Sequence, residues 1–115
     1  MNAMQAIEMT YTDRCSVYRV VEVEKPSGET ITERKTIYDS IKCALSKKDA
    51  YPADQTNTVN KVQFVMKLFL NPMFTILPGD EIHVESFGAT YKTTAGMPRP
   101  YDSHQEIALE VKENA

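Results

Sequence analysis

The sequence predicts an all-β protein, a small antiparallel β-barrel of six to seven strands with one long polar loop. Runs that alternate apolar and polar residues, typical of half-buried strands, recur along the chain, and residues that favour tight turns separate them. The clearest turn is Leu77–Asp80, in which Pro78 fixes φ at the second position and Gly79 accepts the positive φ of the third. It introduces two alternating segments, Glu81–Ser86 and Thr90–Gly96, which form a short-turn meander and set the fold class.

Size and composition are those of one soluble globular domain. The chain has 115 residues, 42% of them hydrophobic and 25% charged, enough for one core without disulfides or metal. Its formal net charge of −3 argues against a dedicated nucleic-acid surface. The sequence contains no apolar run of the roughly 20 residues that span a bilayer, and its start has no secretory signal, so we expect a cytoplasmic product.

Residues 1–14 are predicted to form an N-terminal arm, followed by a single β-barrel domain at 15–115. Met4, Ile7 and Met9 follow a loosely helical spacing, but so short a stretch is not stable as an isolated helix. The arm is either frayed or ordered against a neighbouring molecule. Its three apolar residues are therefore candidates for a subunit interface.

Three strands are expected in the first half of the domain. Cys15–Val23 carries apolar residues on both faces, and residues 25–28 (Lys-Pro-Ser-Gly) form a hairpin turn. Glu29–Asp39 is so polar that it reads as an edge strand protected by its charges. Ile41–Ser46 is a short third strand with clear alternation.

Lys47–Asn60 is predicted to be a long polar loop. Loops of this length inside a compact domain are uncommon and are usually functional or disordered. One interpretation is a gate that reaches into a channel, and the alternative is an ordinary surface loop. The candidate gating residues are Lys47, Lys48, Asp49, Asp54, Gln55, Asn57 and Asn60.

Two further strands are expected after the loop. Val62–Leu70 has the strongest inward face in the chain, and it also places Val65 and Phe69 on its outer side. Two apolar residues on one outer face indicate a subunit contact. Gln105–Lys112 alternates regularly and closes the fold.

The sequence offers no recognisable catalytic or metal-binding motif. Cys15 and Cys43 lack the spacing of a zinc site, as do His83 and His104, and no signature of a nucleophilic cysteine flanks them. Buried free thiols are favoured over a disulfide, which needs an oxidising compartment. We therefore expect no enzyme activity, no cofactor, and no catalytic, cofactor-binding or metal-ligating residue.

Several stretches of the chain share a pattern with a known family: Thr12–Arg19, Gly28–Thr30, Ile41–Ser46, Leu77–Ile82 with Gly88, Tyr91 and Gly96, and His104–Glu110. These stretches resemble the phage head-completion proteins, the head-tail connector or head-closure (stopper) proteins of long-tailed phages and defective prophages. The likeness extends over residues 12–112. One departure is Ala44, which stands where family members often carry an arginine.

The resemblance implies a structural role at the head-tail interface of a virion, for a protein made in the host bacterial cytoplasm. Family members form a ring, here expected to be dodecameric, although the isolated chain can be a monomer. The ring closes the portal channel after packaging and provides the docking surface for the tail. The expected partners are portal and adaptor proteins and a tail-terminator or other tail protein. DNA passes through without sequence-specific binding, and no membrane is involved.

Other interpretations of the sequence stay open. A neighbouring connector, such as a tail terminator or an adaptor, belongs to the same class, although adaptors are typically helical. A monomeric small β-barrel that binds a small ligand or nucleic acid belongs to a different class. An enzyme without a recognisable motif is the last alternative.

Overall fold

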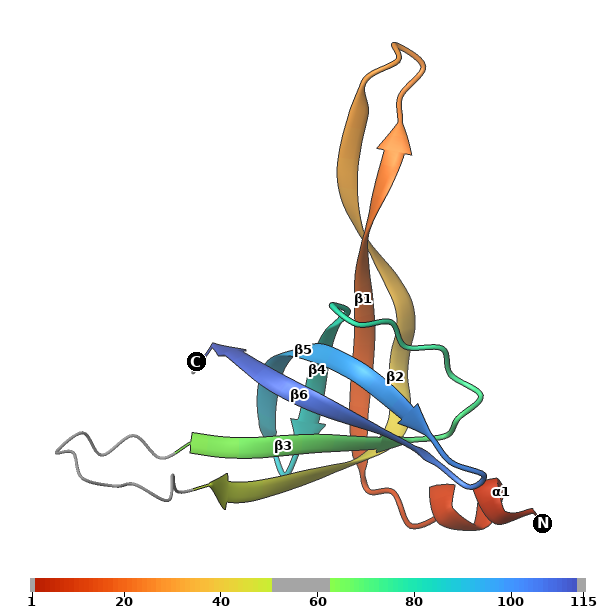
Figure 1. Ribbon diagram of the computed structural model, residues 1–115, viewed down its shortest axis with the longest axis vertical. Helices are drawn as coiled ribbons and strands as arrows, with labels where there is room; N and C mark the ends of the chain where they lie inside the picture. Colours follow the sequence, from red (N-terminus) through yellow and green to blue (C-terminus); the bar gives the residue numbers. More distant parts are fainter. Residues whose placement is uncertain (1, 51–62, 114–115) are drawn as a thin grey trace, which may run out of the picture.

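The computed structural model describes residues 2–50 and 63–113, which form an all-β protein with one short helix (Figure 1). Its six strands are hydrogen-bonded in a closed ring in the order β1-β2-β3-β6-β5-β4, and all neighbours are antiparallel. The elements are α1 (Ala3–Glu8), β1 (Asp13–Glu24), β2 (Thr30–Ala50), β3 (Gln63–Leu70), β4 (Glu81–Ser86), β5 (Ala89–Pro100) and β6 (Gln105–Glu113). The predicted all-β, antiparallel class is confirmed.

The core fills the inside of the ring, and strand alternation explains its composition. Fully buried residues come from five strands: Val17 on β1, Cys43 on β2, Leu68 on β3, Ile82 on β4 and Ile107 on β6. β5 contributes the buried Thr93, whose hydroxyl donates to the carbonyl of Ile82 at 2.8 Å. The expected inward faces of the strands are therefore confirmed where the structure describes them.

The turn at Leu77–Asp80 forms as expected. Gly79 has a φ of 90°, and the Asp80 amide donates to the Leu77 carbonyl at 3.1 Å. The Gly79 amide also donates to the carbonyl of Ala95, and the Ala95 amide donates to the carbonyl of Asp80, both at 2.8 Å. These bonds tie the turn to β5, so its position relative to the ring is fixed.

The separate strands expected at Glu29–Asp39 and Ile41–Ser46 are instead one strand, β2. The break in alternation near Ser40 is a bulge, because Ser40 adopts a φ of 51° and the register with β1 shifts there. The Ser40 amide donates to Ser16 Oγ at 3.1 Å, so this irregular point is tied to the neighbouring strand. A bulge interrupts the period without ending the strand.

The expected start of the polar loop at Lys47 is also wrong. Lys47, Lys48 and Asp49 belong to β2, where they pair with residues of β3. β2 continues because β3 offers a complementary edge that a polar local sequence does not reveal. The other candidate gating residues, Asp54, Gln55, Asn57 and Asn60, lie outside the described residues.

The N-terminal residues are not simply a frayed arm. Ala3–Glu8 form the helix α1, which begins at a capping box: the Asn2 side chain accepts from the Gln5 amide at 2.8 Å. The boundary of the strand domain also moves, since β1 begins at Asp13 rather than at Cys15. Asp13 is buried and accepts a hydrogen bond from the Leu45 amide at 2.8 Å, which explains the earlier start.

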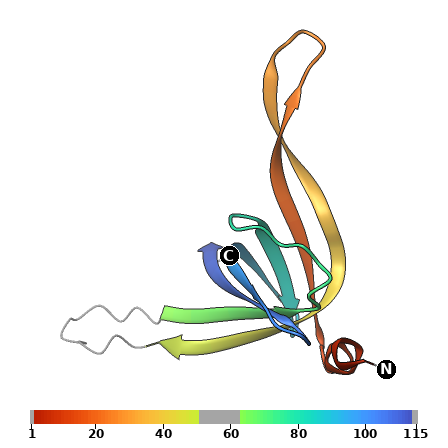
Figure 2. The same cartoon turned by 45° about the vertical axis from the view of Figure 1, so that its right-hand side comes forward.

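β1 and β2 continue beyond the ring as a two-stranded ribbon, which we call the projecting hairpin (residues 19–35; Figures 1 and 2). β1 pairs with β4 only from Arg14 to Tyr18, and β2 pairs with β3 only from Ala44 onward. Within the described residues, the backbones of the hairpin strands therefore pair only with each other. The expected edge character of Glu29–Asp39 is confirmed for this part.

Both cysteines lie inside the ring as free thiols. Cys15 and Cys43 are at most 2% exposed. We expect a maleimide or disulfide reagent to label the native protein slowly, with labelling accelerated by denaturant. Mass spectrometry of samples taken over time measures the labelling. Rapid labelling of both thiols in the native protein would contradict their placement inside the ring.

Candidate functional site: the projecting hairpin, its anchor and the outer wall

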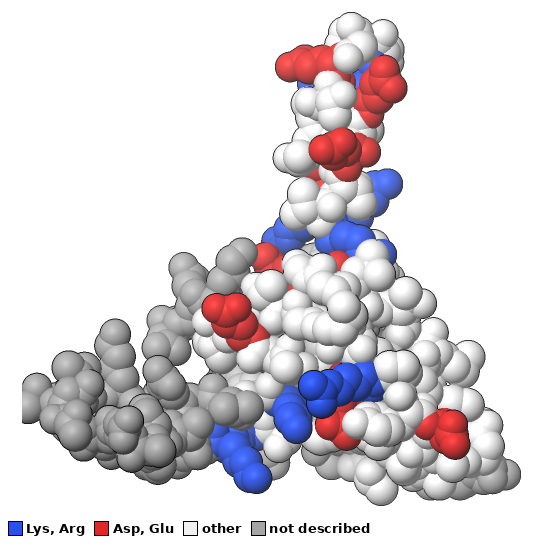
Figure 3. Space-filling model, viewed as in Figure 1, with Lys and Arg blue, Asp and Glu red and all other residues white. Residues whose placement is uncertain are grey.

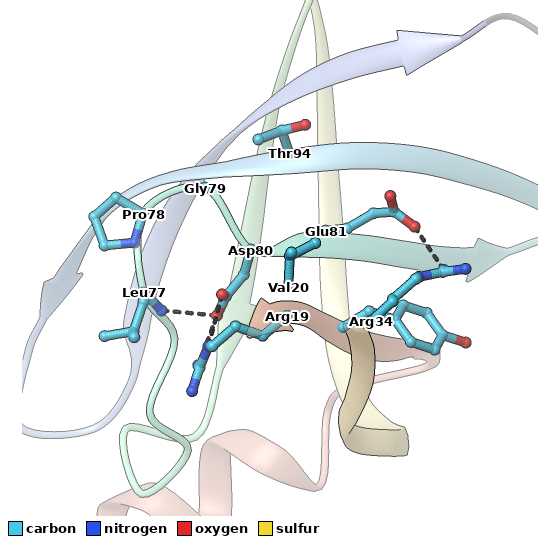
Figure 4. Close-up of a pocket in the computed structure, with 10 residues that line it drawn as sticks. Arg19, Val20, Arg34, Leu77, Pro78, Gly79, Asp80, Glu81 and Thr94 are labelled. Atoms are coloured by element: carbon cyan, nitrogen blue, oxygen red, sulfur yellow. Dashed lines mark hydrogen bonds and ion pairs between the residues drawn. The ribbon is translucent and has the colours of Figure 1, made fainter. Parts of the chain in front are cut away.

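The projecting hairpin is anchored to the ring by an ion pair between Arg19 on β1 and Asp80 in the turn before β4 (Figure 4). Arg19 Nε and Nη2 each donate to one Asp80 carboxylate oxygen at 2.8 Å, the two-bond geometry that fits a guanidinium to a carboxylate. The Leu77 amide donates to the same carboxylate at 2.9 Å. Asp80 is only 3% exposed, so the pair is protected from water on the carboxylate side.

The hydrogen bonds to Asp80 raise the pKa of Arg19 above its ordinary value. Arg19 therefore stays charged at any pH at which the protein is folded. Its Nη2 also donates to the carbonyl of Thr75 at 3.3 Å, which brings the segment between β3 and β4 into the same anchor. The Tyr38 hydroxyl accepts from the Thr75 amide at 2.9 Å, so β2 holds this segment as well.

A second set of contacts supports the other face of the hairpin base. The Arg34 guanidinium lies 4.1 Å from the centre of the Tyr18 ring and donates to Glu81 at 2.6 Å. His83 lies 4.8 Å from the Tyr18 ring centre, and its Nε2 is 2.7 Å from Glu81 Oε2. The hairpin is therefore held at its base from both faces.

A cavity of about 370 Å³ lies between the hairpin base and the Leu77–Asp80 turn (Figure 4). Its lining includes the charged groups of Arg19, Arg34, Asp80 and Glu81. All four already form ion pairs within the chain. The groups that line the cavity therefore fix the angle of the hairpin and are not available to a small ligand without breaking that support.

The distal part of the projecting hairpin is acidic and carries apolar residues that the ring does not cover. In the distal part, residues 21–33, the charged residues are four acids and one base: Glu22, Glu24, Lys25, Glu29 and Glu33. Arg34 and Lys35 follow at the hairpin base. Val20 is 67% exposed. On the opposite face, Val21 and the paired residues Val23 and Ile31 are only half-buried. A two-stranded ribbon of this kind is marginally stable in water, so its faces are suited to a contact with another surface.

A second exposed surface, which we call the outer wall, covers the outside of β2, β3, β6 and β5. The exposed residues of the outer wall include Lys48, Lys67, Met97, Arg99, Tyr101, Ala108 and Glu110, with Phe69, His104 and Glu106 partly exposed among them. The cross-strand pairs Lys67↔Ala108 and Arg99↔Glu106 place these side chains on one face. Lys67, Met97, Arg99, Glu106 and Ala108 line a hollow of about 450 Å³.

Aromatic residues extend the outer wall beyond its charges. The Tyr101 ring stacks on His104 with centroids 4.9 Å apart, and Phe69 lies 5.9 Å from the same imidazole. Met97 is 72% exposed. An arginine, aromatic rings and an exposed methionine thus share one surface, and these residue types are enriched at protein interfaces.

The residues that the sequence singled out for a subunit interface do not all fall on one surface. Phe69 lies on the outer wall, while the side chain of Val65 lies outside the described part. Met4 and Ile7 on α1 are partly exposed, and Met9 is 67% exposed after it. The structure thus gives Phe69 a cluster of neighbours from β5 and β6 that the sequence did not predict.

Sequence reasoning missed the projecting hairpin as a separate feature. The turn at residues 25–28 was visible, but nothing local shows that the flanking strands outrun their neighbours in the ring. One usable signal was present: Thr30–Lys35 is polar at almost every position, as expected of a strand that no sheet covers.

Among the described residues, no three side chains of His, Cys, Asp or Glu are placed to hold a metal ion. None of the helices in this part of the chain is long and apolar enough to cross a membrane. Comparison of the chain with models of protein families, with curated protein sequences and with solved structures gave no match.

Proposed function

We propose that this chain is a structural subunit of a phage head-tail connector, which forms a ring that closes the portal channel and presents a docking surface for the tail. The observation that carries the proposal is the projecting hairpin, rigidly anchored at its base and uncovered along its distal part. Such an extension allows an assembly subunit to reach a neighbouring molecule. In this proposal the closed strand ring is a small β-barrel that serves as the rigid body of the subunit.

The sequence resemblance to head-completion proteins supports the same proposal. The stretches that carry it are neighbours in the fold, since Thr12–Arg19 contributes most of the part of β1 that pairs with Ile41–Ser46 and with β4. The Leu77–Asp80 turn, which belongs to the resemblance, supplies the carboxylate that anchors the hairpin. Residues that resemble the family therefore build the rigid body and the hairpin base together.

The direct test is electron microscopy of this protein mixed with a portal–adaptor complex from the same genome. We expect an additional ring of density on the adaptor, on the side away from the capsid. Portal–adaptor complexes without the protein are the control. Unchanged density at saturating protein would overturn the proposed function.

A substitution on the outer wall tests the proposal in assembled particles. Phe69→Lys is expected to leave the monomer folded, because Phe69 lies on the outside of β3, and to prevent attachment to connectors. The matched control is Phe87→Lys, the same change at a turn residue that is 96% exposed and lies outside the outer wall. Filled, tailed particles counted at normal frequency with Phe69→Lys would show that this surface is not used.

A further inference from the structure

We propose that the projecting hairpin of one copy docks on the outer wall of a second copy of this chain. The two surfaces lie on different parts of the subunit, so the contact is heterologous: each copy offers its hairpin to one neighbour and its wall to another. Repetition of such a contact builds a ring or an open filament. The inference deepens the proposed function by naming the contact that would join subunits, but its evidence is the shape and charge of this chain alone.

Charge complementarity is the first argument. Residues 21–33 of the hairpin carry four glutamates and one lysine, whereas the outer wall carries Lys48, Lys67 and Arg99 against Glu106 and Glu110. In Figure 3 the upper part of the hairpin is mostly acidic, whereas basic side chains lie at its base and, together with some acidic ones, on the body. Complementary surfaces of this kind steer association and fix the register of the contact.

The ion pairs among the described residues leave basic side chains of the outer wall able to bind further carboxylates. Lys67 Nζ is 3.8 Å from Glu106 Oε1, at the long limit for an ion pair. Arg99 forms no ion pair with any described residue, although it is exposed beside the same hollow. A glutamate of the hairpin that reached this hollow would therefore meet an unneutralised guanidinium.

Dimensions and apolar residues agree with the same contact. The hairpin segment from Val20 to Glu24 is about 17 Å long at roughly 3.3 Å per residue. The β3 segment from Met66 to Leu70 has the same number of residues and therefore the same length. Val20 is 67% exposed on the hairpin face that also carries Glu22 and Glu24, and Met97 is 72% exposed on the outer wall beside the aromatic cluster. Burying both in one interface covers surface that each subunit otherwise leaves exposed to water.

The charge distribution disfavours contact between two hairpins. A symmetric contact of that kind would bring two sets of four glutamates together, and like charges at an interface oppose association. The hairpin base is no alternative docking site, because its charged groups are already paired with one another. A second copy's outer wall is thus the surface of this chain that fits the hairpin best.

Cross-linking between two variants that each carry one added cysteine tests the contact directly. Thr30→Cys places a thiol on the distal hairpin and Ala108→Cys places one in the hollow of the outer wall, and neither removes a charge. The native cysteines are buried and do not compete. After mixing the folded proteins and adding a short bis-maleimide, we expect at least tenfold more heterodimer than in a control mixture of Thr30→Cys with Thr90→Cys, which is exposed away from the wall.

Charge reversal supplies the second arm of the experiment. Lys67→Glu with Arg99→Glu, added to the Ala108→Cys variant, should abolish the cross-link, and Glu22→Lys with Glu24→Lys on the hairpin partner should restore it. Heterodimer yields equal to the Thr90→Cys control would overturn the inference, and so would a cross-link between two Thr30→Cys copies that exceeds the mixed one. The cross-linking mixture contains only copies of this chain, so its result does not depend on any phage component. A positive cross-link together with a failure to bind the portal–adaptor complex would reject the proposed function but support this contact.

Discussion

Replacing Asp80 with Asn is expected to lower the free energy of unfolding by about 3 kcal/mol, because it leaves a partly buried guanidinium without its counter-charge. The carboxylate of Asp80 is almost fully buried and accepts two hydrogen bonds from Arg19 and one from the Leu77 amide. An amide of the same shape keeps one acceptor but turns a donor toward these three donors. Urea unfolding at neutral pH, with the denaturant dependence compared between variants, measures the loss.

Glu81→Gln is the matched control for this change. It breaks the pair with Arg34 of β2, but both of those side chains are substantially exposed, and such pairs contribute roughly 0 to 1 kcal/mol. The hairpin amides should exchange faster in Asp80→Asn than in Glu81→Gln, because the former loses the more buried of the two ion pairs at the hairpin base. Equal stability of the two variants would show that the Arg19–Asp80 pair does not support the hairpin.

The elements that the sequence predicts best are those determined by residues a few positions apart in the chain. The expected bounds of β4, Glu81–Ser86, agree with the structure, and the turns on either side of it form at Gly79 and Gly88 with positive φ. Here the turn residues and the alternation of a short strand act within a few positions of one another. Local chemistry was therefore sufficient for this part of the fold.

β2 shows where prediction from local sequence alone fails. Ser40 interrupts the alternation, and a bulge and a turn produce the same interruption in a sequence. What distinguishes them is the neighbouring strand, because Ser16 accepts the Ser40 amide and β1 pairs with β2 on both sides of it. The same dependence on a partner strand explains why Lys47–Ala50 is strand rather than loop.

The candidate site was least accessible to sequence reasoning because its parts are distant in the chain. Arg19 and Asp80 are separated by 61 positions, and neither lies in a motif that requires the other. The outer wall similarly joins residues of β3 with residues of β5 and β6. Phe69 was recognised as an outward apolar residue, but its neighbours Tyr101 and His104 follow only from the strand order of the ring.

Alkaline pH is expected to destabilise the protein through Cys43. This thiol is completely buried, and its contact with the Cys15 thiol followed by its removal from water raises its pKa far above the ordinary value of 9.0. The folded protein therefore keeps the proton on Cys43, whereas the unfolded chain releases it once the pH exceeds about 9. A group that binds its proton more tightly in the folded state makes stability fall as the pH rises.

The size of the effect follows from the same linkage. Above the unfolded pKa, one retained proton changes the free energy of unfolding by about 1.4 kcal/mol per pH unit, which amounts to roughly 2 kcal/mol between pH 9 and pH 11. Below pH 8 the thiol is protonated in both states, so no dependence from Cys43 is expected there. Burial also raises the pKa of Tyr11, which adds a loss in the same direction at higher pH.

Cys43→Ala separates the thiol from the other titrating groups. The variant loses some packing at every pH, but its stability should fall less steeply than that of the unaltered protein between pH 9 and pH 11, with the difference in slope equal to the contribution of Cys43. Urea unfolding at 25 °C in the presence of a reductant, at intervals of half a pH unit, measures both curves. Parallel curves would mean that Cys43 ionises as readily in the folded protein as in the unfolded chain, and its placement inside the closed ring of strands would then be wrong.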